Sequence, residues 1–169
     1  MFEKFGEFNS AEEINAEAEI MKMTGETQKV IELAKENGID EDDAKDYLDD
    51  IVPVLCTPPM AALGKLKIEA DKCNVSKGIL KDWLNVIEQQ CMEDEKFCEN
   101  VRQKEKALKH CMARLIRFSF ENKVPISDEI VNVTKVTHNG KEEAMRKPLY
   151  LGVPSAVEAK KIVREYYLG

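Results

Sequence analysis

The sequence predicts a mainly α-helical protein, a bundle of about eight short to medium helices with a small β-hairpin near residues 133–153. Apolar residues recur at spacings of three and four through most of the chain, which is the helical period. Serine and aspartate residues at N-cap positions, and glycines after apolar stripes, mark where helices begin and end. A chain of 169 residues is long enough for one domain or for two small ones.

Residues 1–52 are expected to form an acidic region of three helices. A capping box at residues 10–13 begins the first helix, and Gly25 ends it. A second helix runs from about Glu26 to Glu36, and acidic residues 40–43 cap a third. In the second and third helices, the side chains expected to face inward are Val30, Ile31, Ala34, Ala44, Tyr47, Leu48 and Ile51.

Residues 60–169 are expected to form a second helical region with a basic C-terminal half, and a single domain over the whole chain is the alternative. Pro53, Pro58 and Pro59 interrupt the helical period, so residues 53–59 are the expected boundary. Three helical patterns follow the boundary, and Trp83 is expected to anchor the core. The apolar positions of these patterns are Leu63, Leu66, Ala70, Leu80, Trp83, Leu84, Ile87, Cys91, Leu108, Cys111, Met112, Leu115, Ile116 and Phe118.

The C-terminal part of the chain mixes short helices with extended segments. Ser127 is placed to begin a short helix. The dipeptide Asn139-Gly140 favours a type I′ turn, and Val133, Val136 and residues 149–153 suggest two extended segments around it. The second arm of this hairpin, residues 141–147, is polar and poor in β-branched residues. A second capping box, at residues 155–158, predicts that the chain ends in a helix. The apolar residues of that helix are Val157, Ile162, Val163 and Tyr166.

Composition disfavours membrane and secreted proteins. The apolar stretch Ile51–Cys56 contains a proline and is far shorter than the roughly 20 residues that a membrane span needs. The N-terminus lacks the basic and apolar regions of a secretory signal. The five cysteines, an odd number without short paired spacings, favour free thiols in a reducing compartment. A cytoplasmic protein is therefore expected.

No motif in the sequence predicts catalysis, a cofactor or a metal site. An EF-hand loop beginning at Asp40 would need a glycine where Lys45 stands and a glutamate where Ile51 stands. The closest cysteines, Cys91 and Cys98, are seven residues apart, whereas zinc ligands come in pairs two to four residues apart. We therefore expect a protein without enzymatic activity, cofactor or bound metal.

The net charge of −7 conceals two blocks of opposite sign. Residues 1–50 carry 16 acids and 5 bases, whereas residues 101–169 carry 8 acids and 14 bases. The acidic cluster is either a solvated helix whose acids stabilise its N-terminal dipole or a contact surface for a partner. It comprises Asp40, Glu41, Asp42, Asp43, Asp46, Asp49 and Asp50.

The basic block predicts one charged helix face, formed by Arg102, Lys106, Lys109 and Arg117, since their spacings place them together on a helix. Three interpretations of this face are open. It is solvated, it pairs with the acidic block, or it contacts the phosphates of a nucleic acid.

Four short motifs follow one another in the C-terminal part of the chain. Residues 93–97 read Glu-Asp-Glu-Lys-Phe, residues 106–112 read Lys-Ala-Leu-Lys-His-Cys-Met, residues 126–130 read Ile-Ser-Asp-Glu-Ile, and residues 164–167 read Arg-Glu-Tyr-Tyr. In this order they resemble the PcfK-like family, small accessory proteins of conjugative elements in gut Firmicutes. Because some relatives of that family are described as Cas9-inhibiting anti-CRISPR proteins, the resemblance implies a part in mobile-element transfer or in evasion of host defence. It spans residues 93–169 and identifies no functional site.

These observations lead to three hypotheses about function. The first is a non-enzymatic accessory protein of a mobile element that acts by protein binding, with an anti-CRISPR inhibitor of a Cas9-type nuclease as its specific form. Its partner would be a nuclease or a DNA-transfer protein. The second is a small DNA-binding module that uses the basic helix face. The third is a structural subunit with an obligate protein partner, which exposed apolar residues would favour. The oligomeric state is open.

Overall fold

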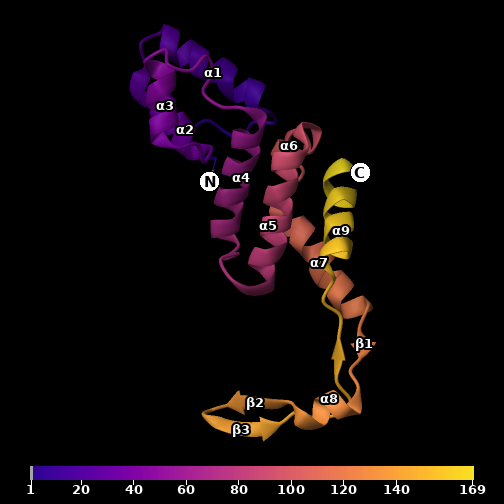
Figure 1. The fold of residues 1–169 in the computed structure, drawn as a ribbon. Helices are drawn as coiled ribbons and strands as arrows, with labels where there is room; N and C mark the ends of the chain where they lie inside the picture. Colours follow the sequence, from indigo (N-terminus) through magenta and orange to yellow (C-terminus); the bar gives the residue numbers. More distant parts are fainter. Residues whose placement is uncertain (1) are drawn as a thin grey trace.

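The structure of the protein is a computed structural model that describes residues 2–169 (Figure 1). Within these residues, nine helices and two small antiparallel strand pairs confirm the mainly helical fold with a small hairpin. The helices are α1 (Ala11–Met23), α2 (Thr27–Glu36), α3 (Glu41–Leu48), α4 (Pro58–Lys72), α5 (Gly78–Glu93), α6 (Glu95–Arg102), α7 (Leu108–Glu121), α8 (Asp128–Val133) and α9 (Ala156–Leu168). The strands are β1 (Val124–Pro125), β2 (Lys135–His138), β3 (Lys141–Ala144) and β4 (Tyr150–Leu151).

Helices α1, α2 and α3 pack around the first of two hydrophobic cores, together with the loop that leads into α4. The predicted cap of α1 is present, because the Ser10 hydroxyl accepts a hydrogen bond from the Glu13 amide at 3.2 Å. Tyr47 of α3 is buried, as expected. The prediction that Ile51 faces inward is wrong. Its side chain is 67% exposed because α3 ends at Leu48 and the chain has left the helix before Ile51.

Helix α4 is shared by the two cores. Thr57 caps it, with its hydroxyl accepting a hydrogen bond from the Met60 amide at 3.4 Å. Pro58 occupies the first helical position, where the missing amide proton costs no helical hydrogen bond. Ala61 belongs to the first core and Leu66 to the second. The expected boundary therefore leads directly into α4, and α4 packs in both cores.

The second core lies among α4, α5, α6, α7 and α9. Trp83 on α5 is 4% exposed and is a core residue, as expected. Phe97 of α6 and Tyr167 of α9 meet edge to face, with ring centroids 5.3 Å apart. The predicted capping box of Ser155 and Glu158 begins α9, which brings the C-terminus back beside the bundle (Figure 1). Residues distant in sequence therefore close this core.

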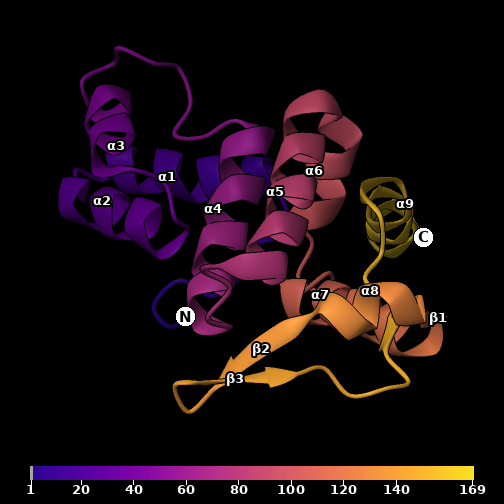
Figure 2. The same cartoon turned by 60° about the horizontal axis from the view of Figure 1, so that its bottom comes forward.

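Residues 120–157, here called the arm, extend away from the helical bundle between α7 and α9 (Figures 1 and 2). Strands β2 and β3 pair around Asn139 and Gly140, whose φ angles of 51° and 76° are those of a type I′ turn. The hairpin is confirmed, and its second strand, Lys141–Ala144, lies within the expected second arm. Residues 149–153 do not pair with β2, since Tyr150 and Leu151 form β4 and pair with β1. All eight residues of β2 and β3 are exposed, so a polar second strand is tolerated.

The longest helices, α5 and α4, contain 16 and 15 residues. In the part of the chain that the structure describes, no helix combines the length and the apolar composition that crossing a membrane requires.

Candidate interaction surfaces

The acidic surface, defined as Asp40, Glu41, Asp42, Asp43, Asp46, Asp49 and Asp50, lies on α3 and its two flanking turns. The local sequence explains its position. Ala44 and Tyr47 point into the first core, so the acidic residues between and around them are left on the solvent side of the helix. All seven are exposed except Asp43, which is half-buried. The structure thus brings the whole predicted acidic cluster together on one accessible face.

Three lysines form ion pairs with the acidic surface. Lys45 contacts Glu41 at 2.9 Å and Asp42 at 3.2 Å, and these carboxylates raise the pKa of the lysine. Lys22 contacts Asp50 at 2.6 Å, and Lys67 contacts Asp40 at 3.7 Å. None of these three lysines lies in residues 101–169. The basic block therefore does not neutralise the acidic surface, whose seven carboxylates exceed its three lysine partners.

The C-terminal end of α3 carries more negative charge than local stability favours. Acids in the first turn of a helix stabilise its dipole, whereas acids near the last turn oppose it. Asp46 and Asp49 lie toward the C-terminal end, and within residues 2–169 neither forms an ion pair. Asp50 adopts a left-handed backbone with φ 60°, a conformation that glycine adopts at lower cost. Helix capping alone does not account for these three aspartates.

Two hollows adjoin the acidic surface. A hollow of about 300 Å³ lies between α2 and α4, with Asp40 and Glu41 at its edge. Lys67 and Asp71 of α4 line both this hollow and an open groove of about 700 Å³ between α4 and α5. The acidic surface, the hollow and the groove therefore form one continuous surface.

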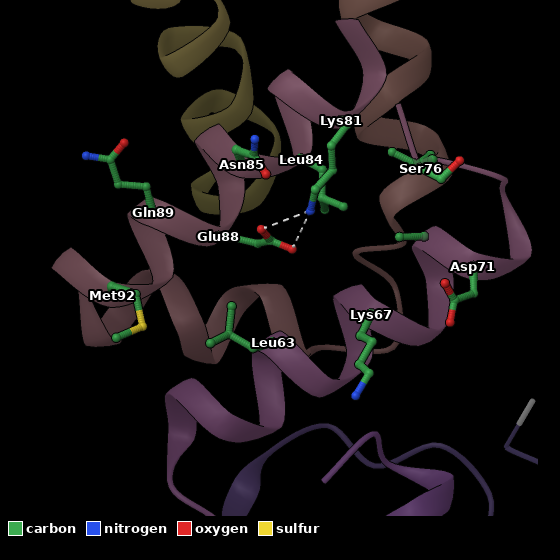
Figure 3. A pocket seen from close by; sticks show the side chains of 12 residues that line it. Leu63, Lys67, Asp71, Ser76, Lys81, Leu84, Asn85, Glu88, Gln89 and Met92 are labelled. Carbon is green, nitrogen blue, oxygen red and sulfur yellow. Dashed lines mark hydrogen bonds and ion pairs between the residues drawn. The ribbon is translucent and has the colours of Figure 1, made fainter. Parts of the chain in front are cut away.

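The groove between α4 and α5 combines apolar and charged side chains (Figure 3). Leu63 and Met92 supply apolar surface, and the Met92 side chain is 70% exposed. Lys81 and Glu88 of α5 point toward each other across about two turns, with Nζ and Oε2 3.4 Å apart. Charges of both signs line the groove and pair with each other. The groove therefore adds a recess and apolar contacts beside the acidic surface, and its lining does not carry charge of a single sign.

The prediction of one basic helix face is wrong. Helix α6 ends at Arg102 and α7 begins at Leu108, so the four residues do not share a helix. Arg102 is 1% exposed, and Lys106 donates a hydrogen bond to the Tyr166 carbonyl at 2.9 Å. Lys109 and Arg117 do lie on α7 and are exposed. Arg117 is 3.8 Å from Glu121 on the same helix.

Tertiary contacts stabilise the break between α6 and α7. Lys65 of α4 donates hydrogen bonds to the carbonyls of Gln103 and Lys106 in the turn. The Glu69 carboxylate accepts a hydrogen bond at 2.8 Å from the amide of Leu108, the first residue of α7. These partners lie about 40 positions earlier in the sequence. The helical spacing of the basic residues does not predict these long-range hydrogen bonds.

A polar cluster, here called the polar junction, lies between the two cores. It comprises Arg102, Lys65, Glu69, Asn37 and Glu7. The Arg102 guanidinium donates to the Asn37 side-chain oxygen at 2.7 Å, and Lys65 lies 3.5 Å from Glu7. Burial lowers the pKa of Lys65 and of Arg102 and raises the pKa of Glu69. For each of these three groups, burial is the largest cause of the pKa shift. The junction fixes the N-terminal helices to the bundle, and all its members except the half-buried Glu7 are too buried to contact a large partner.

Four of the five cysteines are buried and apolar in character. Burial raises the pKa of Cys56 to about 12 and that of Cys111 to about 12, so both thiols stay protonated. Cys98 donates a hydrogen bond to the Cys91 carbonyl at 2.6 Å, whereas Cys73 is exposed. Among the described residues, no group of three or more histidine, cysteine, aspartate or glutamate side chains is arranged so that it could hold a metal ion.

Comparisons of this chain with protein families, with curated proteins and with solved structures find no significant match.

Proposed function

We propose that this protein is a non-enzymatic binding protein whose acidic surface contacts a basic surface of a protein partner. The observation that carries the proposal is a set of seven carboxylates, six of them exposed, with three lysine partners, none of them from the basic block. The unpaired Asp46 and Asp49 support it further, because they oppose the dipole of the short helix that carries them. Charge that costs local stability is expected where binding requires it.

The acidic surface has the chemistry to compete with a nucleic acid. Proteins that hold DNA or RNA line their grooves with lysine and arginine, which bind phosphates mainly through charge. A rigid row of carboxylates presents negative charge to such a groove and attracts it over several ångströms before contact. The adjoining hollow and groove add apolar contact area beside the charge. The surface would therefore occupy a nucleic-acid groove without any chemical step.

The resemblance of residues 93–169 to PcfK-like proteins supports a narrower partner class. In that setting the protein is an accessory protein of a mobile element, and its partner is a nuclease or a DNA-transfer protein. The most specific form of the proposal is inhibition of a Cas9-type nuclease. The acidic surface lies outside the part of the chain that carries the resemblance, so the two observations support the proposal independently.

A plasmid-cleavage assay tests the proposal. We expect a molar excess of the native protein to block cleavage by a purified Cas9-type nuclease. The triple variant Asp42→Asn, Asp46→Asn, Asp49→Asn should inhibit at least about 10-fold less potently, because it removes three exposed charges of the acidic surface.

The matched control neutralises three exposed glutamates elsewhere, Glu99→Gln, Glu105→Gln and Glu165→Gln, and should inhibit as the native protein does. Cleavage that is unchanged by excess native protein would remove the nuclease-inhibitor form. Inhibition that falls equally in both triple variants would show that net charge, not the acidic surface, is responsible.

The other two functions differ in their support. The DNA-binding module loses its geometric basis, since Arg102 is buried and Lys106 is engaged by α9. A structural subunit with an obligate partner is favoured by a specific observation, the exposed apolar side chains of the arm. That observation identifies a surface separate from the acidic one.

A further inference from the structure

The arm, residues 120–157, exposes an unusual amount of apolar surface. Val133 and Val157 are each 80% exposed, and Phe120 is 67% exposed. Six further large apolar side chains of the arm are also exposed, namely Val124, Ile130, Val136, Tyr150, Leu151 and Val153. Within the arm, which the structure describes completely, Val131 and Pro154 are the only buried residues. The arm therefore has almost no core of its own.

The strand pairs of the arm are too small to be stable by themselves. The β2–β3 hairpin has four residues in each strand, all of them exposed, and both of its edges are open. The β1–β4 pair has only two residues in each strand, with Val124 opposite Leu151 on one face. Isolated two-stranded hairpins are marginal in water, and open edges accept further strands. Both features indicate that something packs on the arm.

The exposed apolar area matches one side of a protein interface. At their individual exposures, which run from 39% for Val136 to 80% for Val133 and Val157, the nine side chains contribute on the order of 800 Å², against about 800 Å² per partner in a standard protein interface. The largest apolar patch of a typical monomer is about 300–600 Å². An area of this size is enough for a stable dimer.

The charges of the arm are compatible with a second copy of itself. Residues 120–157 contain five acids and five bases, so the arm is neutral. Two of its ion pairs are internal, Lys135 with Glu142 at 3.4 Å and Lys147 with Asp128 at 3.2 Å, and Glu121 pairs with the neighbouring Arg117 of α7 at 3.8 Å. In a two-fold dimer the same patch faces itself, so a patch of one charge would repel its own copy. A neutral patch of mixed sign does not, and it offers no excess positive charge to a nucleic acid.

The position of the arm also suits self-association. The β2–β3 hairpin and the α1–α3 region lie at opposite ends of the molecule (Figures 1 and 2). Two copies that meet at their arms therefore keep their acidic surfaces apart, where the repulsion between them is screened by salt. We propose that two copies of this chain form a two-fold dimer through their arms, burying the exposed apolar side chains of residues 120–157 against each other.

Sedimentation of the full chain tests the dimer. The native protein should sediment at twice the monomer mass of 19.2 kDa. In the double variant Val133→Glu, Val157→Glu, the dissociation constant of the dimer should rise at least about 100-fold, because each copy would bury two unpaired charges in the interface. The matched control is Met23→Glu, Met92→Glu, at positions 82% and 70% exposed outside the arm, and it should remain dimeric.

Two results would overturn the dimer. One is a native protein that stays at 19.2 kDa at about 100 µM, since interfaces of this area bind in the micromolar range or tighter. The other is a dimer that survives in the arm variant. Far-UV circular dichroism verifies that both variants remain helical, which is expected because all four positions face solvent. The dimer does not depend on the acidic surface, so its failure leaves the proposed function standing.

Discussion

Lys65 shows how a single residue joins the two halves of the molecule. Its side chain is fully buried, yet its ammonium group has partners, the carbonyls of Gln103 and Lys106 and the carboxylate of Glu7. Burial penalises the charged form and lowers the pKa of Lys65, although Glu69 and Glu7 oppose that shift. The lysine is therefore retained for its directed hydrogen bonds, which define the turn between α6 and α7.

Lys65→Met should destabilise the protein by about 1–3 kcal/mol near neutral pH, because two partly buried carbonyls lose their donor. The difference should increase with pH. The folded-state pKa of Lys65 lies below the unfolded value of 10.5, so the folded state releases the proton first and the native protein gains stability between the two values. Urea unfolding at about pH 7 and about pH 10 measures both effects.

Lys67→Met is the matched control for Lys65→Met. Lys67 lies two residues further along α4, and its side chain is 66% exposed. Its effect on the free energy of unfolding should be small. A difference for Lys65→Met that shrinks as pH rises would contradict the assignment of burial as the dominant cause.

Cysteine reactivity is a second prediction at the residue scale. Cys73 is exposed and should react rapidly with Ellman's reagent in the native protein, whereas the four buried cysteines should react only after unfolding. One thiol should therefore be detected before denaturant is added and five afterwards. The variant Cys73→Ser should show none before denaturant. A fast thiol in that variant would mean that the core opens readily.

At the scale of the elements, the close contact between α4 and the turn that follows α2 determines how the two cores meet. Gly38, just after α2, and Gly64 of α4 lie backbone against backbone. A Cβ atom on Gly64 would overlap the Asn37 carbonyl oxygen and would lie 3.1 Å from the Gly38 carbonyl carbon. Asn37 in turn accepts the hydrogen bond from Arg102. This glycine contact therefore positions the polar junction.

Gly64→Ala should destabilise the protein by about 2–3 kcal/mol, because the two backbones must separate. The sign is informative, since alanine is favoured over glycine inside a helix by about 1 kcal/mol when space allows. Thermal unfolding measures the change. Gly25→Ala is the comparison, because no atom lies within 4 Å of its added Cβ and only its left-handed backbone, φ 76°, costs about 1 kcal/mol. A Gly64→Ala variant as stable as the native protein would exclude the tight crossing.

At the scale of the whole molecule, the structure separates two surfaces of different chemistry. The acidic surface lies on the N-terminal helices, and the neutral apolar arm extends from the opposite end (Figure 1). A dimer formed through the arms would present two acidic surfaces, so binding to a partner with two basic sites would gain in avidity without new contacts. The plasmid-cleavage and sedimentation predictions test these two surfaces separately.

The local features of the fold were predictable from the sequence. The caps of Ser10 and Ser155, the turn at Asn139-Gly140 and the buried position of Trp83 all depend on interactions between neighbouring residues or on a helical period. The exposure of the acidic surface follows in the same way, because Ala44 and Tyr47 specify the inner side of α3.

Long-range contacts decided what the local patterns left open. The spacing of Arg102, Lys106 and Lys109 is helical, but hydrogen bonds from Lys65 and to Glu69 place a turn among them and bury Arg102. The pairing of β4 with β1 and the extension of the arm are equally invisible in a local pattern.

The sequence by itself determined the helical class, the helix caps, the hairpin turn and the acidic surface, because each depends on residues a few positions apart. The tertiary structure decided where the basic residues lie, how the turn after α2 meets α4 and which apolar side chains stay exposed. The physical reason is that burial and hydrogen bonding join residues about 40 positions apart, such as Lys65 and Gln103, whose proximity no local spacing encodes.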